Sequence, residues 1–269
     1  MVLFAGAAYI IPSGGQSNEV QLILTVSTFL FAIIVGFYLS RLNGRYDKMR
    51  ELIAAEDAGW LSAYEQSVFL GSDFQAKVGD VIDKYYISAY DFKLGTHKGY
   101  TEAYMQEIYK LMSEAKNVEG FKAENAFDHI TAIMEDIEKQ RNEVTVVTLE
   151  KLTKGQWGII FILAGIILFG MFFLRGEAFY SGVIVVLLST VLALILLVMR
   201  DLQNFFLGGT SVVEESGQQV FETIGKLRYY PDLYLRQHPV DLPPHVSKYR
   251  VGYHEAGQPH KIELRELSK

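Results

Sequence analysis

The sequence contains no cysteine and only six prolines in 269 residues. The absence of cysteine excludes disulfides, thiolate zinc sites and thiol chemistry. Five of the six prolines lie between Pro231 and Pro259, so the C-terminal tail, residues 231–269, is not expected to be helical. An excess of basic residues is also missing. The net charge of −6 argues against a nucleic-acid-binding protein, which would need a basic face.

Charge is absent from three long stretches of the chain. These runs are Val20–Ser40, Gly155–Leu174 and Ala178–Met199, with 21, 20 and 22 residues. At 1.5 Å per residue, each is long enough to cross the roughly 30 Å hydrocarbon core of a lipid bilayer as a helix. The sequence therefore predicts an all-α, multi-pass membrane protein with transmembrane helices over residues 20–40, 155–174 and 178–199.

The distribution of lysine and arginine predicts the orientation in the membrane. Neither residue occurs before Arg41, whereas four of them lie in the ten residues that follow the first span. Lys151 and Lys154 precede the second span, and Arg200 follows the third. By the positive-inside rule, residues 1–19, a short apolar segment, lie outside a cell membrane, and residues 41–154 and 200–269 are cytoplasmic.

Apolar residues between the first two spans recur at helical spacing. They predict a cytoplasmic bundle of four helices over residues 41–154. The first of these continues the first span to about Leu70, and the last, about 124–154, runs on into the second span. A juxtamembrane amphipathic helix is expected over 200–230. In the tail, residues 247–254 and 260–267 alternate loosely in polarity and predict a small β-hairpin.

Chemical motifs are scarce. The six histidines lack the spacing of a zinc site, and the glycine pairs lack a phosphate-binding context, so we expect no metal, no cofactor and no enzyme activity. Glu56-Asp57 and Glu135-Asp136-Glu138 could bind a cation, but their helical position favours a solvated face. The spans contain no Asp, Glu, His, Lys or Arg, which argues against a proton relay.

One face of the first span has a regular pattern. Thr25, Phe29, Ile33 and Phe37 recur at every fourth position. In a span that is apolar almost throughout, such a pattern more often only faces lipid or a neighbouring helix. Hydrophobic constrictions can, however, also gate a pore by dewetting, with charged residues at its mouths.

The stretch Phe31–Tyr46, FAIIVGFYLSRLNGRY, resembles the pore helix of bestrophin channels. The whole layout resembles the bestrophin-like prokaryotic membrane protein family of unknown function, with a charged helix after the span, a two-span hairpin and an exit formed here by Asp201, Phe205 and Gly208. Three features depart from the pattern. The usual first span is absent or reduced to Met1–Pro12, the exit lacks the proline commonly seen before its phenylalanine, and the acidic calcium clasp of animal bestrophins has no counterpart.

The resemblance implies a homo-oligomer, a pentamer, that binds the lipid bilayer and conducts small ions, with anions favoured. It assigns residues to three regions of the pore, which are the neck (Phe29, Ile33, Phe37), the outer approach (Thr25, Thr28, Gly36) and the cytoplasmic mouth (Arg41, Arg45). The alternative is a membrane-anchored interaction or sensor protein whose bundle binds a partner and whose spans do not conduct.

Overall fold

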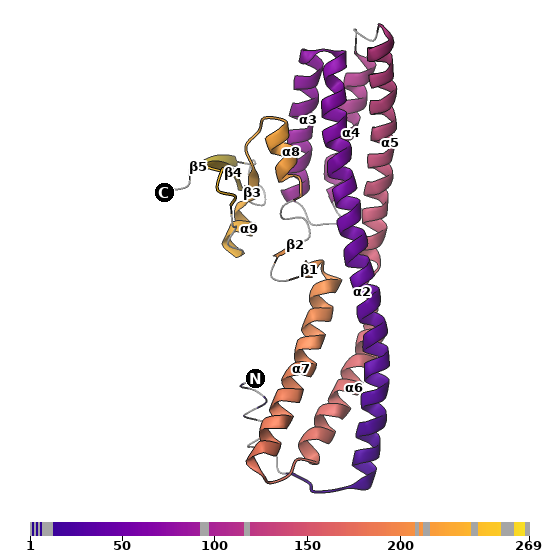
Figure 1. Cartoon of the computed structure of the whole chain (residues 1–269), viewed down its shortest axis with the longest axis vertical. Coiled ribbons are helices and arrows are strands. Elements are labelled where there is room, and N and C mark those ends of the chain that lie inside the picture. Colours follow the sequence, from indigo (N-terminus) through magenta and orange to yellow (C-terminus); the bar gives the residue numbers. More distant parts are fainter. Residues whose placement is uncertain are drawn as a thin grey trace. The chain divides into compact units, whose positions relative to one another are not determined.

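The structure is a computed structural model, and it describes residues 13–91, 97–115, 119–207, 210–211, 216–237, 242–253 and 261–266, together with Val2, Phe4 and Gly6. The chain forms two compact units (Figure 1). The first unit comprises residues 1–47 and 151–207, and the second comprises residues 48–150 and 208–269. One long helix, α2 (Asn18–Ser67), contributes its N-terminal part to the first unit and the remainder to the second.

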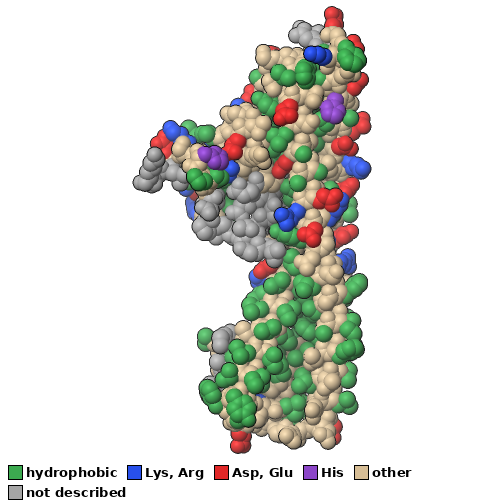
Figure 2. All heavy atoms as spheres, in the orientation of Figure 1, with side chains coloured by type: hydrophobic (Ala, Val, Ile, Leu, Met, Phe, Trp, Pro, Cys, Tyr) green, Lys and Arg blue, Asp and Glu red, His purple; other side chains and the backbone are tan. Residues whose placement is uncertain are grey.

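The first unit contains the three apolar helices. They are α2, α6 (Lys154–Phe173) and α7 (Phe179–Gln203), and the most apolar windows of the three have mean hydropathies of 2.4, 2.2 and 3.0. Each is long and apolar enough to cross a membrane, so the predicted fold class is confirmed. On the visible face, hydrophobic side chains gather over these helices, whereas charged side chains are spread over the second unit (Figure 2).

Close packing joins the three helices of the first unit. Phe31, Val35 and Leu42 of α2 form one core with residues of α6 and α7. At Gly170 of α6 the backbone approaches Leu24 so closely that an added Cβ would lie 3.2 Å from the Leu24 Cβ. Glycine therefore permits the contact between α6 and α2.

The second unit is a helical bundle. Its helices are the C-terminal part of α2, the 3-10 turn η1 (Val68–Leu70), α3 (Ser72–Asp91), α4 (His97–Ser113) and α5 (Phe121–Leu149). Trp60, Tyr85, Ile108 and Met134 are almost completely buried in its core, one from each long helix. The helical spacing of apolar residues in the sequence produces these four buried stripes.

The C-terminal residues add a small sheet and two short helices to the second unit. Strands β3 (Tyr229–Pro231), β4 (Lys248–Tyr253) and β5 (Lys261–Glu266) lie in that order, and α8 (Gln218–Thr223) and α9 (Asp232–Gln237) flank β3. β4 and β5 are antiparallel, with Val251 opposite Glu263, which confirms the predicted hairpin. β3 pairs in parallel with β4 and was not predicted.

The prediction that the helix over about 124–154 runs unbroken into the second span is wrong. α5 ends at Leu149, and α6 begins after a new N-cap at Thr153. The Thr153 hydroxyl accepts a hydrogen bond from the Gln156 amide, and the Gln156 side chain accepts one from the Thr153 amide. This reciprocal capping box satisfies the backbone groups of a separate helix start.

The single amphipathic helix expected over residues 200–230 is also wrong. α7 ends at Gln203, Phe205 adopts a positive φ of 57°, and short strands β1 (Phe206–Leu207) and β2 (Thr210–Ser211) follow. Among the described residues of this range, helix resumes in α8, and Gly217 and Gly225, both with positive φ, bound it. Within the tail, α9 corrects the expectation that no helix occurs there.

Candidate functional site

The three predicted neck residues lie on one exposed face of α2. Phe29, Ile33 and Phe37 are 67%, 55% and 68% exposed in the single chain. At 1.5 Å per residue, they extend over about 12 Å along the helix axis. The face is thus apolar, continuous over two turns and not covered by the described residues of its own chain.

The opposite face of α2 is buried. Residues two positions apart on a helix are about 200° apart around its axis. Phe31 and Val35, each two positions from neck residues, are therefore nearly opposite the neck face, and both are buried against α6 and α7. The packing within the first unit consequently determines which side of α2 is turned outward.

The predicted approach residues are also exposed. The Thr25 hydroxyl donates to the Gln21 carbonyl at 2.8 Å, so the helix backbone already satisfies its proton. Thr28 and Gly36 are exposed, and a Cβ at Gly36 would meet no other atom within 4 Å. About three turns of α2, from Thr25 to Gly36, therefore present small or weakly polar groups beside the large apolar ones.

The two predicted mouth residues differ in their surroundings. Arg41 is exposed, whereas Arg45 is only 5% exposed. The Arg45 guanidinium lies 4.4 Å from the centre of the Phe205 ring and donates to the Gln203 carbonyl at 3.4 Å. In one chain, Arg45 is therefore directed towards the end of α7, where a cation–π contact and a hydrogen bond hold it.

Gln203 joins three segments at the same place. Its side-chain oxygen accepts hydrogen bonds from the Leu152 amide and from the Trp157 indole, both at 3.1 Å. We call Arg45, Leu152, Trp157, Gln203 and Phe205 the membrane-exit cluster. The bestrophin-like resemblance of the exit segment pointed to Phe205 but not to Gln203. Gly208, which belongs to the same segment, lies outside the described residues.

A second site, in the second unit, contains two carboxylates that we expected on a solvated face. That expectation is wrong, because Glu56 is buried and Asp57 is partly buried. The Tyr85 hydroxyl donates to Glu56, and the Tyr86 hydroxyl donates to Asp57 at 2.6 Å. Asp57 also accepts from the Ser216 hydroxyl at 2.7 Å and from the Gly217 amide at 3.0 Å.

Burial dominates the electrostatics of this pair. Loss of hydration raises the pKa of Glu56 to about 7, although the Tyr85 hydrogen bond and the Arg141 charge oppose the change. Burial raises the pKa of Asp57 as well, against the hydrogen bonds from Tyr86, Ser216 and Gly217. The pair therefore holds a proton near neutral pH more strongly than two solvated carboxylates would.

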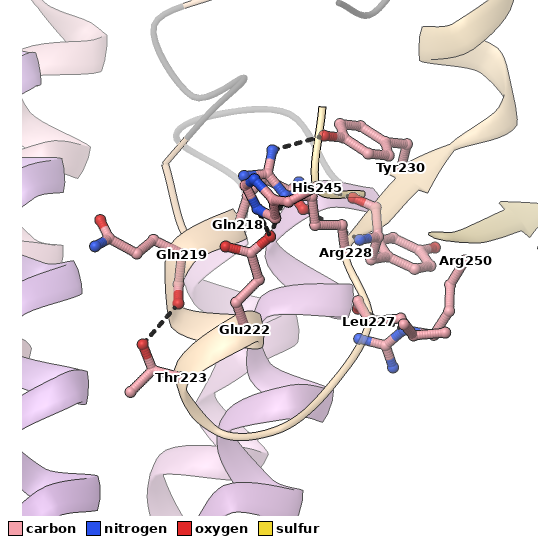
Figure 3. Close-up of polar contacts among 10 residues, drawn as sticks. Gln218, Gln219, Glu222, Thr223, Leu227, Arg228, Tyr230, His245 and Arg250 are labelled. Atoms are coloured by element: carbon pink, nitrogen blue, oxygen red, sulfur yellow. Dashed lines mark hydrogen bonds and ion pairs between the residues drawn. The ribbon is translucent and has the colours of Figure 1, made fainter. Parts of the chain in front are cut away.

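A network of polar contacts attaches the residues after Gly217. Glu222 accepts from the Arg228 guanidinium at 2.8 Å and lies 3.2 Å from His245 Nε2 (Figure 3). The hydrogen bond from Arg228 lowers the pKa of Glu222. Arg250 forms a bidentate pair with Asp83 of α3, at 2.6 and 2.9 Å. The Glu222 contacts join α8 to the residues that follow it, and the Arg250–Asp83 pair holds β4 against α3.

Comparison with protein families finds a match over most of the chain. The family described as Bestrophin-like domain matches residues 11–216, about three quarters of the chain. The matched range includes the neck face, the membrane-exit cluster and the carboxylate pair. Comparisons with curated proteins and with solved structures give no significant match.

Proposed function

Because the chain belongs to the bestrophin-like domain family, we propose that it assembles into a homo-oligomeric, pentameric membrane channel for small ions. The neck is the Phe29, Ile33 and Phe37 face of α2, repeated around the axis. The observation that supports this proposal is the position of the neck face, opposite the face of α2 that packs within the chain. A hydrophobic neck of this kind gates by excluding water.

The exposed arc of α2 is wider than the neck face. Leu22, Ile23, Val26 and Leu30 are exposed as well. In the proposed assembly, lipid and neighbouring copies cover these residues, and the neck face lines the axis. Thr25, Thr28 and Gly36 line the approach to the neck.

Positive charge at the inner end of the neck favours anions. Arg41 lies about one helical turn beyond Phe37 and is exposed, and the buried Arg45 adds a second positive charge about one turn further along. Such a ring of charge raises the local anion concentration. By the positive-inside rule, the Arg41 end of the neck faces the cytoplasm. The protein then crosses the cell membrane with its N-terminus outside and its C-terminus in the cytoplasm.

Ion flux into liposomes tests the channel directly. Wild-type protein should conduct anions, and Phe37→Ala should raise the flux about tenfold, because a wider neck lowers the dewetting barrier by about 1.4 kcal/mol. Phe169→Ala is the matched control, since Phe169 is a similarly exposed phenylalanine on α6. Absence of flux from both wild type and Phe37→Ala overturns the proposal. If Phe169→Ala raises the flux as much as Phe37→Ala does, the assignment of the neck to this face of α2 is wrong.

The alternative, an anchored interaction or sensor protein, also has an observation in its favour. Phe69 and Phe121 of the second unit are exposed and line a groove of about 480 Å³ with Lys122 and His129. An exposed aromatic groove is a feature of binding sites for protein partners. Mass measurement in detergent separates the two functions, because a monomer excludes a pore on an oligomer axis.

A further inference from the structure

The carboxylate pair lies where three parts of the second unit meet. Glu56 and Asp57 are adjacent on α2, Tyr85 and Tyr86 are adjacent on α3, and each tyrosine hydroxyl donates to one carboxylate. Burial raises the pKa of both hydroxyls, so they remain protonated donors. The third part is the turn Ser216–Gly217, which approaches Asp57 from the chain that follows α7.

The turn is fitted closely to this site. Gly217 has a φ of 71°, and an added Cβ would lie 2.5 Å from the Tyr86 ring, so only glycine fits without strain. The Ser216 hydroxyl and the Gly217 amide both donate to the same Asp57 oxygen, and the Tyr90 hydroxyl donates to the Ser216 carbonyl. The turn is therefore held mainly by one acidic group and the two tyrosines around it.

One basic residue of the described chain acts on Glu56. Arg141 of α5 is the cation that acts on Glu56, and it is itself buried. Its guanidinium donates to Thr101 of α4 at 2.9 Å and lies 3.5 Å from Glu102, so part of its charge is balanced elsewhere. Ionising both Glu56 and Asp57 therefore places two like charges side by side in a buried site, where Arg141 acts on Glu56.

We propose that Glu56 and Asp57 form a proton-controlled latch, which holds the turn Ser216–Gly217 on α2 in mild acid and loosens as the pH rises to neutral. When the pair holds a proton, Asp57 accepts the three hydrogen bonds from Tyr86, Ser216 and Gly217, and the site stays closed. When the proton leaves, repulsion between the two carboxylates favours a state in which the turn separates and water reaches the pair.

The remaining attachments keep the release local. Lys226 pairs with Asp80 at 2.7 Å, and the Tyr229 hydroxyl donates to Asp91 at 2.6 Å. These contacts and the Arg250–Asp83 pair join the C-terminal residues to α3, and none of them includes Glu56. The sheet is therefore expected to stay in place while the turn opens. The latch belongs to the second unit, and its test does not depend on conduction.

Amide hydrogen exchange of the full chain in detergent micelles measures the latch. After correction for intrinsic exchange, protection of the Gly217 amide should fall about tenfold per pH unit from pH 5 to 7 and then level off. Strand β4 is the internal control and should show no such change. Constant protection of Gly217 across this range overturns the proposal.

Three variants assign the effect to Glu56. Glu56→Gln should abolish the pH dependence at Gly217, whereas Glu65→Gln, an exposed position on the same helix, should retain it. Tyr85→Phe removes a hydrogen bond that favours the ionised form of Glu56. The midpoint of the Glu56 titration, seen in the protection of the Gly217 amide, should therefore move up by about one pH unit. This conservative variant serves if Glu56→Gln does not fold. A wild-type profile in Glu56→Gln, or an unmoved midpoint in Tyr85→Phe, overturns the proposal.

Discussion

Replacing Glu56 by glutamine tests how much free energy the burial of this carboxylate costs. The substitution keeps the shape and one oxygen that can accept from the Tyr85 hydroxyl, but it removes the ionisable proton. Any difference between variant and wild type that changes with pH then belongs to Glu56.

The expected magnitude follows from the pKa of Glu56, about 7 in the folded protein against an ordinary value of 4.5. Between these values the folded chain binds more protons than the unfolded chain, so the free energy of unfolding falls as the pH rises through this window and levels off above about 7. At about 1.36 kcal/mol per pKa unit, the wild type loses about 2–3 kcal/mol between pH 5 and pH 8 that Glu56→Gln keeps.

Urea unfolding in micelles at pH 5 and pH 8 measures this difference. With a slope of about 1–3 kcal/mol per M, the midpoint of Glu56→Gln should gain about 1–2 M relative to wild type on going to pH 8. Glu65→Gln should follow the wild type at both pH values. Parallel pH profiles for wild type and Glu56→Gln would show that water hydrates the buried carboxylate and would refute the reasoning.

Three further predictions concern other parts of the chain. Gln203→Leu removes the acceptor of two hydrogen bonds in the membrane-exit cluster and should lower the free energy of unfolding by about 2–4 kcal/mol. In Gly252→Ala the new Cβ would collide with the Tyr229 side chain of β3, so the free energy of unfolding should fall by about 1–3 kcal/mol. Gly44→Ala is its control in open space on α2 and should raise the free energy of unfolding by up to about 1 kcal/mol. The chain lacks cysteine, so a single introduced cysteine reports its own side of the membrane. Gln16→Cys should react with an impermeant maleimide on intact cells, and Glu65→Cys only after permeabilisation. The reverse pattern would show that the protein has the opposite orientation.

Periodicity and length predicted most of the helices. α2 continues from the first span to Ser67 because its apolar stripe persists beyond Arg41, and α3, α4 and α5 complete the predicted bundle of four helices. The predicted hairpin occurs as β4 and β5. These features depend on local patterns, which one sequence contains in full.

The features that sequence reasoning missed depend on competing local signals or on distant partners. Thr153 and Gln156 carry the spacing of a capping box, a signal that could have placed the break before α6. Glu56 lies four residues before Trp60 on the buried stripe of α2, so its register indicated burial although its charge suggested exposure. The partner of Asp57 is about 160 residues away in sequence, and no local pattern encodes that contact.

The C-terminal boundary of the family match has a practical consequence for anyone who shortens the chain. The match ends at residue 216, but Phe221 and Tyr229 are fully buried in the core of the bundle with Tyr86. A protein ending at 216 would leave an apolar surface uncovered on α3 and remove the Gly217 amide from Asp57. We therefore expect it to aggregate. We expect a piece that folds to extend beyond Tyr229, because the family match and the buried core of the second unit end at different residues.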